Sequence, residues 1–228
     1  MGGPSSGSVA IDGHVASGKS VTGHELAKRL RYLYLDTGAM YRAVAYLALH
    51  NGVGIDQEGA LVHLLDDHRV DVAMDESTPL GYVVRVDGVD STDDLFDPEV
   101  TSAVSAVASL PAIRRALVER QREIAREGPV VMAGRDIGTV VLPDARYKFF
   151  LTASLDERAR RRQLEFEERG VHARLEEVRA QIQERDRLDE TRATSPLRRA
   201  PDAMLIDSTG ISAEQVVERM LAAIRSAA

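Results

Sequence analysis

The sequence contains no cysteine, and only three of its 29 basic residues are lysine. Without cysteine the chain can form no disulfide, no thiolate metal site and no cysteine nucleophile, and it suits a reducing compartment. Arginine is therefore the usual cation of this chain. Lys19 stands out against that background, because it follows a glycine-rich segment.

Long apolar runs are also missing, since none approaches the ~20 residues that a membrane span needs. Residues 1–8 lack the basic start and apolar centre of a secretory signal, and we expect a flexible tail there. The excess of 36 acidic over 29 basic residues argues against binding to nucleic acid or anionic membranes. We expect a soluble, cytoplasmic monomer without nucleic-acid or membrane partners.

Five short apolar segments each end at glycine or polar residues, and several alternate with stretches of helical periodicity, such as 19–30. Unbroken apolar strands between helices predict a parallel sheet covered on both faces, a three-layer α/β/α fold. Ligands of such sheets bind at the carboxyl ends of the strands. The five expected strands lie at 9–11, 33–35, 129–133, 147–151 and 203–206.

Two segments depart from this pattern. Residues 66–97 alternate apolar and polar side chains around Asp87-Gly88, which predicts a small antiparallel β insert. Residues 154–192 form two strongly charged helical stretches broken near Gly170. The core then consists of 9–65, 98–153 and 193–228.

The first turn after a strand carries the motif Gly-x-x-x-x-Gly-Lys-Ser at residues 13–20. Glycines let such a loop curl its N–H groups around phosphate oxygens, and the following helix adds its positive end. Lys19 would reach the β- and γ-phosphates, and Ser20 would hold Mg²⁺. The alternative is an ordinary glycine turn. The expected ATP-binding residues are Gly13, His14, Val15, Ala16, Ser17, Gly18, Lys19, Ser20 and Val21.

Other strand ends supply side chains for a second, phosphate-bearing substrate. Thr37 and Arg42 follow the second strand, and Arg135-Asp136 follows the strand that ends at Gly134. A guanidinium grips phosphate in a bidentate manner, and a carboxylate accepts from an amino group or a ribose hydroxyl. The spacing i, i+4, i+7 predicts that a helix presents one further set on a single face, Arg185, Asp189 and Arg192.

These segments resemble the bacterial cytidylate kinases along nearly the whole chain, from residue 11 to residue 208. The most specific stretches are 34–42, 134–145 and 184–192. The resemblance implies a P-loop NTPase fold and transfer of the γ-phosphoryl group of ATP, with Mg²⁺, to CMP or dCMP. It also implies that 66–97 closes over the monophosphate, and that 154–192 contains an arginine-rich lid over ATP.

The resemblance assigns roles to individual residues. The positions that match contacts to CMP are Thr37, Arg42, Ser105, Arg114, Arg135, Asp136, Arg185, Asp189 and Arg192. The expected catalytic set is Lys19, Arg135, Asp136, Arg158, Arg162, Arg185 and Arg192, with Arg161 and Arg169 as further lid residues. Transfer would be in line, without a covalent intermediate.

Simpler interpretations stand beside these roles. The lid arginines could form i,i+4 pairs on a solvated helix, Arg135 and Asp136 could be a structural ion pair, and Arg192 a surface residue. Asp36 is either a Mg²⁺ ligand through water or a helix cap. The competing functions are another P-loop small-molecule kinase, acting on UMP, AMP, GMP or shikimate, and a P-loop nucleotide-binding protein without kinase activity.

The phosphate loop is the least typical part of the match. The family usually has proline at position 14 and threonine at position 21, where this chain has His14 and Val21. Gly23 lies inside the predicted helix and should weaken it by roughly 1 kcal/mol. We therefore expect activity with weakened ATP affinity.

Overall fold

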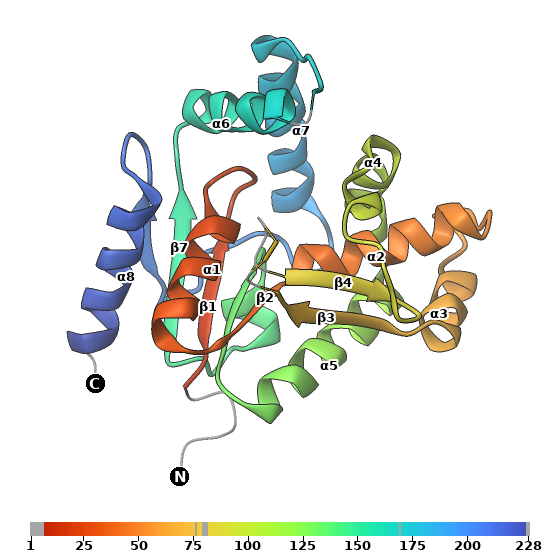
Figure 1. Cartoon of the computed structure of the whole chain (residues 1–228), viewed down its shortest axis with the longest axis horizontal. Coiled ribbons are helices and arrows are strands. Elements are labelled where there is room, and N and C mark those ends of the chain that lie inside the picture. The colour runs from red at the N-terminus through yellow and green to blue at the C-terminus, as the bar shows by residue number, and fades with distance from the viewer. Residues whose placement is uncertain (1–6, 76, 79–81, 169, 227–228) are drawn as a thin grey trace.

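The computed structural model describes residues 7–75, 77–78, 82–168 and 170–226. Its main sheet has five strands in the order β2-β6-β1-β7-β8, and every neighbouring pair is parallel (Figure 1). The predicted five-stranded parallel sheet is confirmed. Most strands extend one or two residues beyond the predicted apolar segments, because their polar end residues still pair. The strands are β1 (Val9–Gly13), β2 (Leu33–Asp36), β6 (Val130–Gly134), β7 (Tyr147–Thr152) and β8 (Met204–Asp207).

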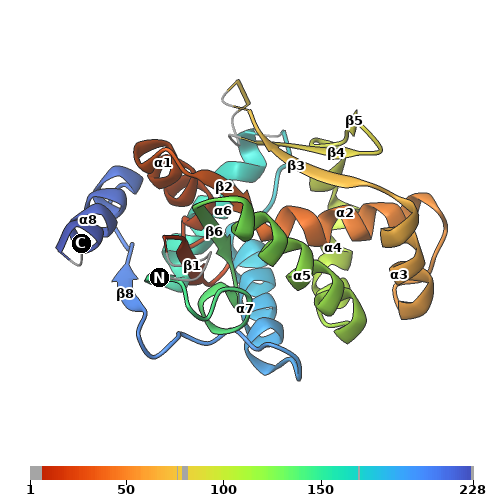
Figure 2. The same cartoon turned by 90° about the horizontal axis from the view of Figure 1, so that it is seen from below.

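Helices cover both faces of this sheet. On one face lie α1 (Lys19–Leu30) and α8 (Ala213–Ser226), which pack against Val9 and Ile11. On the other lie α2 (Thr37–His50) and α5 (Pro111–Glu127), which pack around Ala10, with α3 (Glu58–Asp67) and α4 (Pro98–Val107) beyond them. Figure 2 shows α8 and α5 on opposite sides of β1 and β6. Burial on both faces explains the apolar sequences of β1 and β6, whereas Met204 and Leu205 of the edge strand β8 are exposed.

The insert forms a separate antiparallel sheet in the order β3-β4-β5. It consists of β3 (Val70–Met74), β4 (Tyr82–Val86) and β5 (Val89–Asp90), followed by a short 3₁₀ turn, η1 (Asp94–Phe96). Asp87 and Gly88 connect β4 to β5 with φ of 53° and 83°, the left-handed conformation that a two-residue hairpin turn needs. The predicted antiparallel element is confirmed.

The two charged stretches form α6 (Leu155–Glu168) and α7 (Leu175–Thr191), which lie above the carboxyl ends of the strands (Figure 1). A small apolar cluster of Ala159, Val178 and Ile182 joins them, and Val15 and Ala16 of the phosphate loop pack against it. The helices α6 and α7 and the phosphate loop therefore share one packing unit. Arg169, which we expected in the lid, lies outside the described residues.

Strand register brings the functional loops together. Asp12 of β1 is level with Gly134 of β6 and Phe150 of β7, and Asp36 of β2 is level with Ala133. Because the strands are parallel, the segments that follow them emerge at the same edge. The candidate site lies at this edge.

The predicted flexible tail over residues 1–8 is wrong for Ser8. This residue is fully buried, and its hydroxyl oxygen accepts a hydrogen bond of 3.3 Å from the amide of Val130. Ser8 therefore packs with the core although it precedes β1, while residues 1–6 lie outside the described residues. Within the described part of the chain, no helix is long and apolar enough to cross a membrane.

Candidate active site

The phosphate loop joins β1 directly to α1, as its motif requires. Gly13 has φ of 148°, and a Cβ atom there would lie 2.0 Å from the carbonyl oxygen of Leu151. Gly18 has φ of 91°, and α1 begins immediately after it. Ser17 donates from Oγ to the carbonyl of His14 at 2.8 Å, which closes the loop on itself. The strand–loop–helix context predicted for this motif is confirmed.

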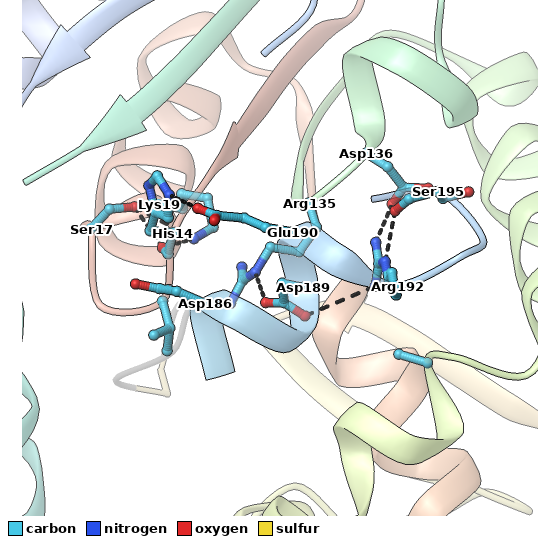
Figure 3. Close-up of polar contacts among 12 residues, drawn as sticks. His14, Ser17, Lys19, Arg135, Asp136, Asp186, Asp189, Glu190, Arg192 and Ser195 are labelled. Carbon is cyan, nitrogen blue, oxygen red and sulfur yellow. Dashed lines mark hydrogen bonds and ion pairs between the residues drawn. The ribbon is translucent and has the colours of Figure 1, made fainter. Parts of the chain in front are cut away.

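Lys19 lies inside this loop and is buried (Figure 3). Its Nζ donates to the carbonyl of His14 at 2.5 Å and to Ser17 Oγ at 3.4 Å. Burial and the nearby guanidinium of Arg135 lower the pKa of Lys19 well below its ordinary value, although Asp36 and Asp189 oppose the shift. An anion held in the loop would raise the pKa of Lys19 again, because a nearby negative charge favours the charged ammonium.

Ser20 and Asp36 meet beside the loop. Ser20 Oγ donates to Asp36 Oδ2 at 2.8 Å, while Asp36 Oδ1 accepts from the amide of Gly38 at 3.0 Å and so caps α2. The hydroxyl and carboxylate fit Mg²⁺, which binds oxygen ligands and keeps several waters beside phosphates. The described residues contain no cluster of three or more acidic or histidine side chains that could hold a metal alone. Mg²⁺ here would depend on the nucleotide phosphates.

A second loop lies beside the first and is fastened to it by Asp12. The carboxylate of Asp12 accepts from the amides of Ile137 and Gly138 at 2.7 and 2.8 Å. Burial raises the pKa of Asp12 to about 6 against these two hydrogen bonds, and Asp136 adds to the shift. Asp12 was not among the expected site residues. Its only signal in the sequence was an acidic residue at the end of an apolar strand.

The residues expected to bind the second substrate centre on Asp136. Its carboxylate forms a buried ion pair with Arg114 and lies 3.8 Å from Arg192, and the side chain of each of the three is at most 8% exposed. Arg114 also donates to the carbonyl of Ala108 at 3.1 Å. Among the described residues, Arg114 Nε and Arg192 Nη2 are buried without a hydrogen-bond partner. This cluster therefore has unused donors beside a fixed carboxylate.

Arg135 and Asp136 do not pair with each other. Arg135 donates from Nε to Asp189 Oδ2 of α7 at 2.8 Å (Figure 3). Burial opposes ionisation of Asp189, but Arg135, followed by Arg185 and Arg192, holds its pKa below the ordinary value. Burial and Arg135 lower the pKa of Arg185 to about 10. Five of the predicted residues thus form one series of alternating charge, in the order Arg114, Asp136, Arg192, Asp189 and Arg135.

The prediction that Arg192 shares a helical face with Arg185 and Asp189 is wrong. α7 ends at Thr191, and Arg192 has extended backbone with ψ of 141°. Its Nε donates to the carbonyl of Ser195 at 2.6 Å, which turns the side chain toward Asp136 (Figure 3). The side chain is buried, so Arg192 is not the surface residue of the simpler interpretation either.

The other expected acceptor residues lie on α2 and α4. Thr37 donates from Oγ1 to the carbonyl of Ala133 at 2.9 Å, which ties the start of α2 to β6. Arg42 donates to Thr101 Oγ1 at 2.7 Å and lies over the ring of Phe96. Ser105 is half-buried on α4. Arg42 thus lies against the end of the insert.

The lid arginines differ from one another. Arg161 pairs with Glu157 at i,i+4, as the simpler interpretation expected, but it also donates to Ser208. Arg162 pairs with Glu165 at i,i+3 on the same helix. Arg158 instead reaches Asp186 of α7 at 2.6 Å. The structure therefore separates Arg158 from the other two.

Comparison with known proteins decides the family. The family model described as "Cytidylate kinase" matches residues 9–226 of this chain. The cytidylate kinase of Geobacillus kaustophilus is 51% identical over 214 residues, 94% of each chain. That of Streptococcus pneumoniae is 47% identical over 214 residues, 94% of this chain and 95% of the relative. The chain belongs to the cytidylate kinase family.

Solved structures add little to this assignment. A gluconokinase from Sinorhizobium meliloti aligns over 97% of this chain and 93% of its own, with 15% identity and a TM-score of 0.44. The assignment to the cytidylate kinases rests on sequence alone.

Two unusual residues of this cytidylate kinase have structural partners. His14 Nε2 lies 3.0 Å from Glu190 Oε1 of α7, and its ring meets Phe150 edge-on. Gly23 packs against Tyr34, where a Cβ atom would approach the ring to 2.7 Å. Val21 is 64% exposed on α1. None of these three residues disturbs the closure of the loop between His14 and Ser17.

Proposed function

We propose that this cytidylate kinase transfers the γ-phosphoryl group of ATP to CMP or dCMP, giving ADP and CDP or dCDP. The observation that carries the proposal is the buried cluster of Arg114, Asp136 and Arg192 beside the phosphate loop. Such a cluster is costly to bury, and unused donors in it favour a role in binding.

The donor nucleotide would bind in the loop from Gly13 to Val21. Backbone N–H groups and Lys19 would hold the phosphates, and Ser20 with Asp36 would face the metal. Mg²⁺, when bound, would offset charge on the β- and γ-phosphates. Arg162 could join them at little cost, because its present partner Glu165 is a half-exposed surface residue.

The acceptor would lie against the cluster at the end of β6. Cytosine carries an amino donor where uracil carries a carbonyl, so the carboxylate of Asp136 favours cytosine if it faces that edge. Arg114 would donate to the base or ribose, and Arg42, Arg135 and Arg192 would hold phosphate oxygens. Reaction would then need only alignment of the two phosphates and exclusion of water.

The direct test is a coupled assay with ATP against CMP, dCMP, UMP, AMP and GMP. We expect CMP and dCMP to be phosphorylated well above the others. A chain that prefers UMP, AMP or GMP would contradict the acceptor assignment, and a chain that phosphorylates none of the five would contradict kinase activity itself. A cytoplasmic location and a monomeric state remain predictions from the sequence.

Arg192→Ala provides the first site prediction. We expect kcat/KM for CMP to fall about 100-fold or more, because a preorganised cation is lost from the reacting phosphates. Arg198→Ala is the matched control, since Arg198 is exposed six residues farther along. Thermal unfolding of both variants shows whether folding is affected. Equal activity of the two variants would contradict a role of Arg192 in the active site.

We do not choose Asp136→Ala for this purpose. That change would leave Arg114 buried without its counter-ion, and such losses destabilise proteins by about 3–5 kcal/mol. Asp136→Ala should therefore lower stability as well as turnover, and Arg192→Ala separates the two effects better.

A further inference from the structure

Two carbonyl groups of the phosphate loop accept hydrogen bonds from side chains of other segments. Val15 accepts from Arg158 Nη1 at 3.3 Å, and Ser17 accepts from Ser208 Oγ at 3.1 Å. In a trans peptide the carbonyl and the next N–H point in opposite directions. A carbonyl held from outside therefore directs the next N–H toward the interior of the loop.

Arg158 is the charged member of this set and comes from the lid helix α6. It is 6% exposed, and its Nε donates to the carbonyl of Ala153 at 3.1 Å. Nη1 donates both to Val15 and to Asp186 Oδ2, the latter at 2.6 Å. Nε and Nη1 of the guanidinium are thus both engaged, which disfavours a swing of the side chain onto a phosphate.

Asp186 supplies the counter-ion from α7 and is buried as well. Its second oxygen, Oδ1, has no hydrogen-bond partner among the described residues. A half-satisfied buried carboxylate is costly, and the ion pair with Arg158 is its principal compensation. Arg160, two residues from Arg158, instead pairs with Glu157 at the surface.

We propose that Arg158 and Asp186 are positioning residues of the phosphate loop. Asp186 orients the guanidinium, Arg158 holds the carbonyl of Val15, and the amide of Ala16 is thereby turned toward the triphosphate. Neither side chain touches the transferred phosphoryl group. This replaces the direct catalytic role that the sequence suggested for Arg158, and it rests on ATP being the nucleotide of this loop.

Asp186→Asn and Arg158→Lys test the proposal, separately and together. We expect KM for ATP and Kd for a non-hydrolysable ATP analogue to rise about tenfold, as for loss of a hydrogen bond to a charged group. KM for CMP and kcat should stay within about threefold, because the reacting groups are untouched. The double variant should be no worse than the weaker-binding single variant, since the two residues act through one carbonyl.

Matched controls come from exposed pairs on the same helices. Glu177→Gln on α7 and Arg160→Lys on α6 remove or alter surface ion pairs and should leave both ATP constants unchanged. A general loosening of the lid would instead change KM for CMP together with that for ATP. Thermal unfolding shows that each variant is folded, and Asp186→Glu, which keeps the charge but displaces it, replaces Asp186→Asn if the latter does not fold.

Two results would overturn the proposal. One is a fall of kcat by about 100-fold in Arg158→Lys with unchanged affinity for the ATP analogue, which would mark Arg158 as a direct ligand of the transition state. The other is unchanged ATP binding in the folded Asp186 variant. Because analogue binding needs no acceptor, these results remain interpretable even if CMP is not the substrate.

Discussion

At the scale of single residues, Asp12 links the two substrate loops. It ends β1, and its carboxylate accepts amide hydrogens from the loop that follows β6. Burial raises its pKa from 3.8 to about 6, so the folded protein holds this proton more tightly than the unfolded chain. The stabilisation that comes from protonated Asp12 is therefore fully present below about pH 4, and it is lost as the pH rises through 6.

This shift predicts a pH dependence that Asp12→Asn removes. Between pH 4 and pH 7.5, the unfolding free energy of the native protein relative to the variant should fall by about 2 kcal/mol. Urea denaturation across this range measures it. Asp207→Asn is the control, because Asp207 is exposed and hydrogen bonds from Thr209 place its pKa below the ordinary value. A difference that does not change with pH would contradict the shifted pKa.

At the scale of elements, α1 is adapted to β2 and to the insert. Gly23 lets the ring of Tyr34 lie against the helix, and Tyr34 in turn meets Tyr82 of β4 at 6.1 Å between ring centroids. Both tyrosines are almost fully buried. The glycine that weakens the helix in isolation thus permits contact between the core and the insert.

Gly23→Ala should therefore destabilise the protein although alanine is the better helix former. The new methyl group would meet a fixed ring, and overpacking costs about 1–3 kcal/mol, more than the roughly 1 kcal/mol gained in propensity. Gly59→Ala in α3 is the matched control. Nothing lies within 4 Å of its Cβ position, so stability should rise. Chemical denaturation compares the two, and a stabilised Gly23→Ala would contradict the packing argument.

At the scale of the whole molecule, α7 joins the two halves of the site. Glu190 contacts His14 of the phosphate loop, and Asp189 contacts Arg135 at the end of β6. Figure 3 shows both contacts on neighbouring residues of the same helix. A nucleotide bound to either loop should therefore also order the helix that borders the other.

Nucleotide binding should raise the melting temperature accordingly. An ATP analogue or CMP at 100 times its own Kd adds about 2.7 kcal/mol to the unfolding free energy. For a chain of this size, that raises the melting temperature by roughly 5–10 °C. Together they should raise it by at least the sum of the two shifts, because the first ligand has already ordered α7. Calorimetry with GMP as control measures this. A combined shift below the larger single one would contradict coupling through α7.

The sequence by itself determined the fold class and the location of the phosphate loop. Apolar runs that end at glycine or polar residues predicted all five strands. For the central strands β1 and β6 the reason is burial on both faces of the sheet, which leaves a local signature. The helix after the loop, Lys19–Leu30, was predicted to the residue. The motifs also supplied the candidate residues of both substrate sites.

Only the tertiary structure decided how the charged residues pair. Arg114 meets Asp136 across 22 residues, Arg158 meets Asp186 across 28, and Asp12 reaches Ile137 across 125. Sequence periodicity reports neighbours three or four residues apart, so the alternative partners that it offered for Arg158 were local. The actual partner of Arg158 depends on where α7 lies over the sheet, and that position is set by packing between distant segments.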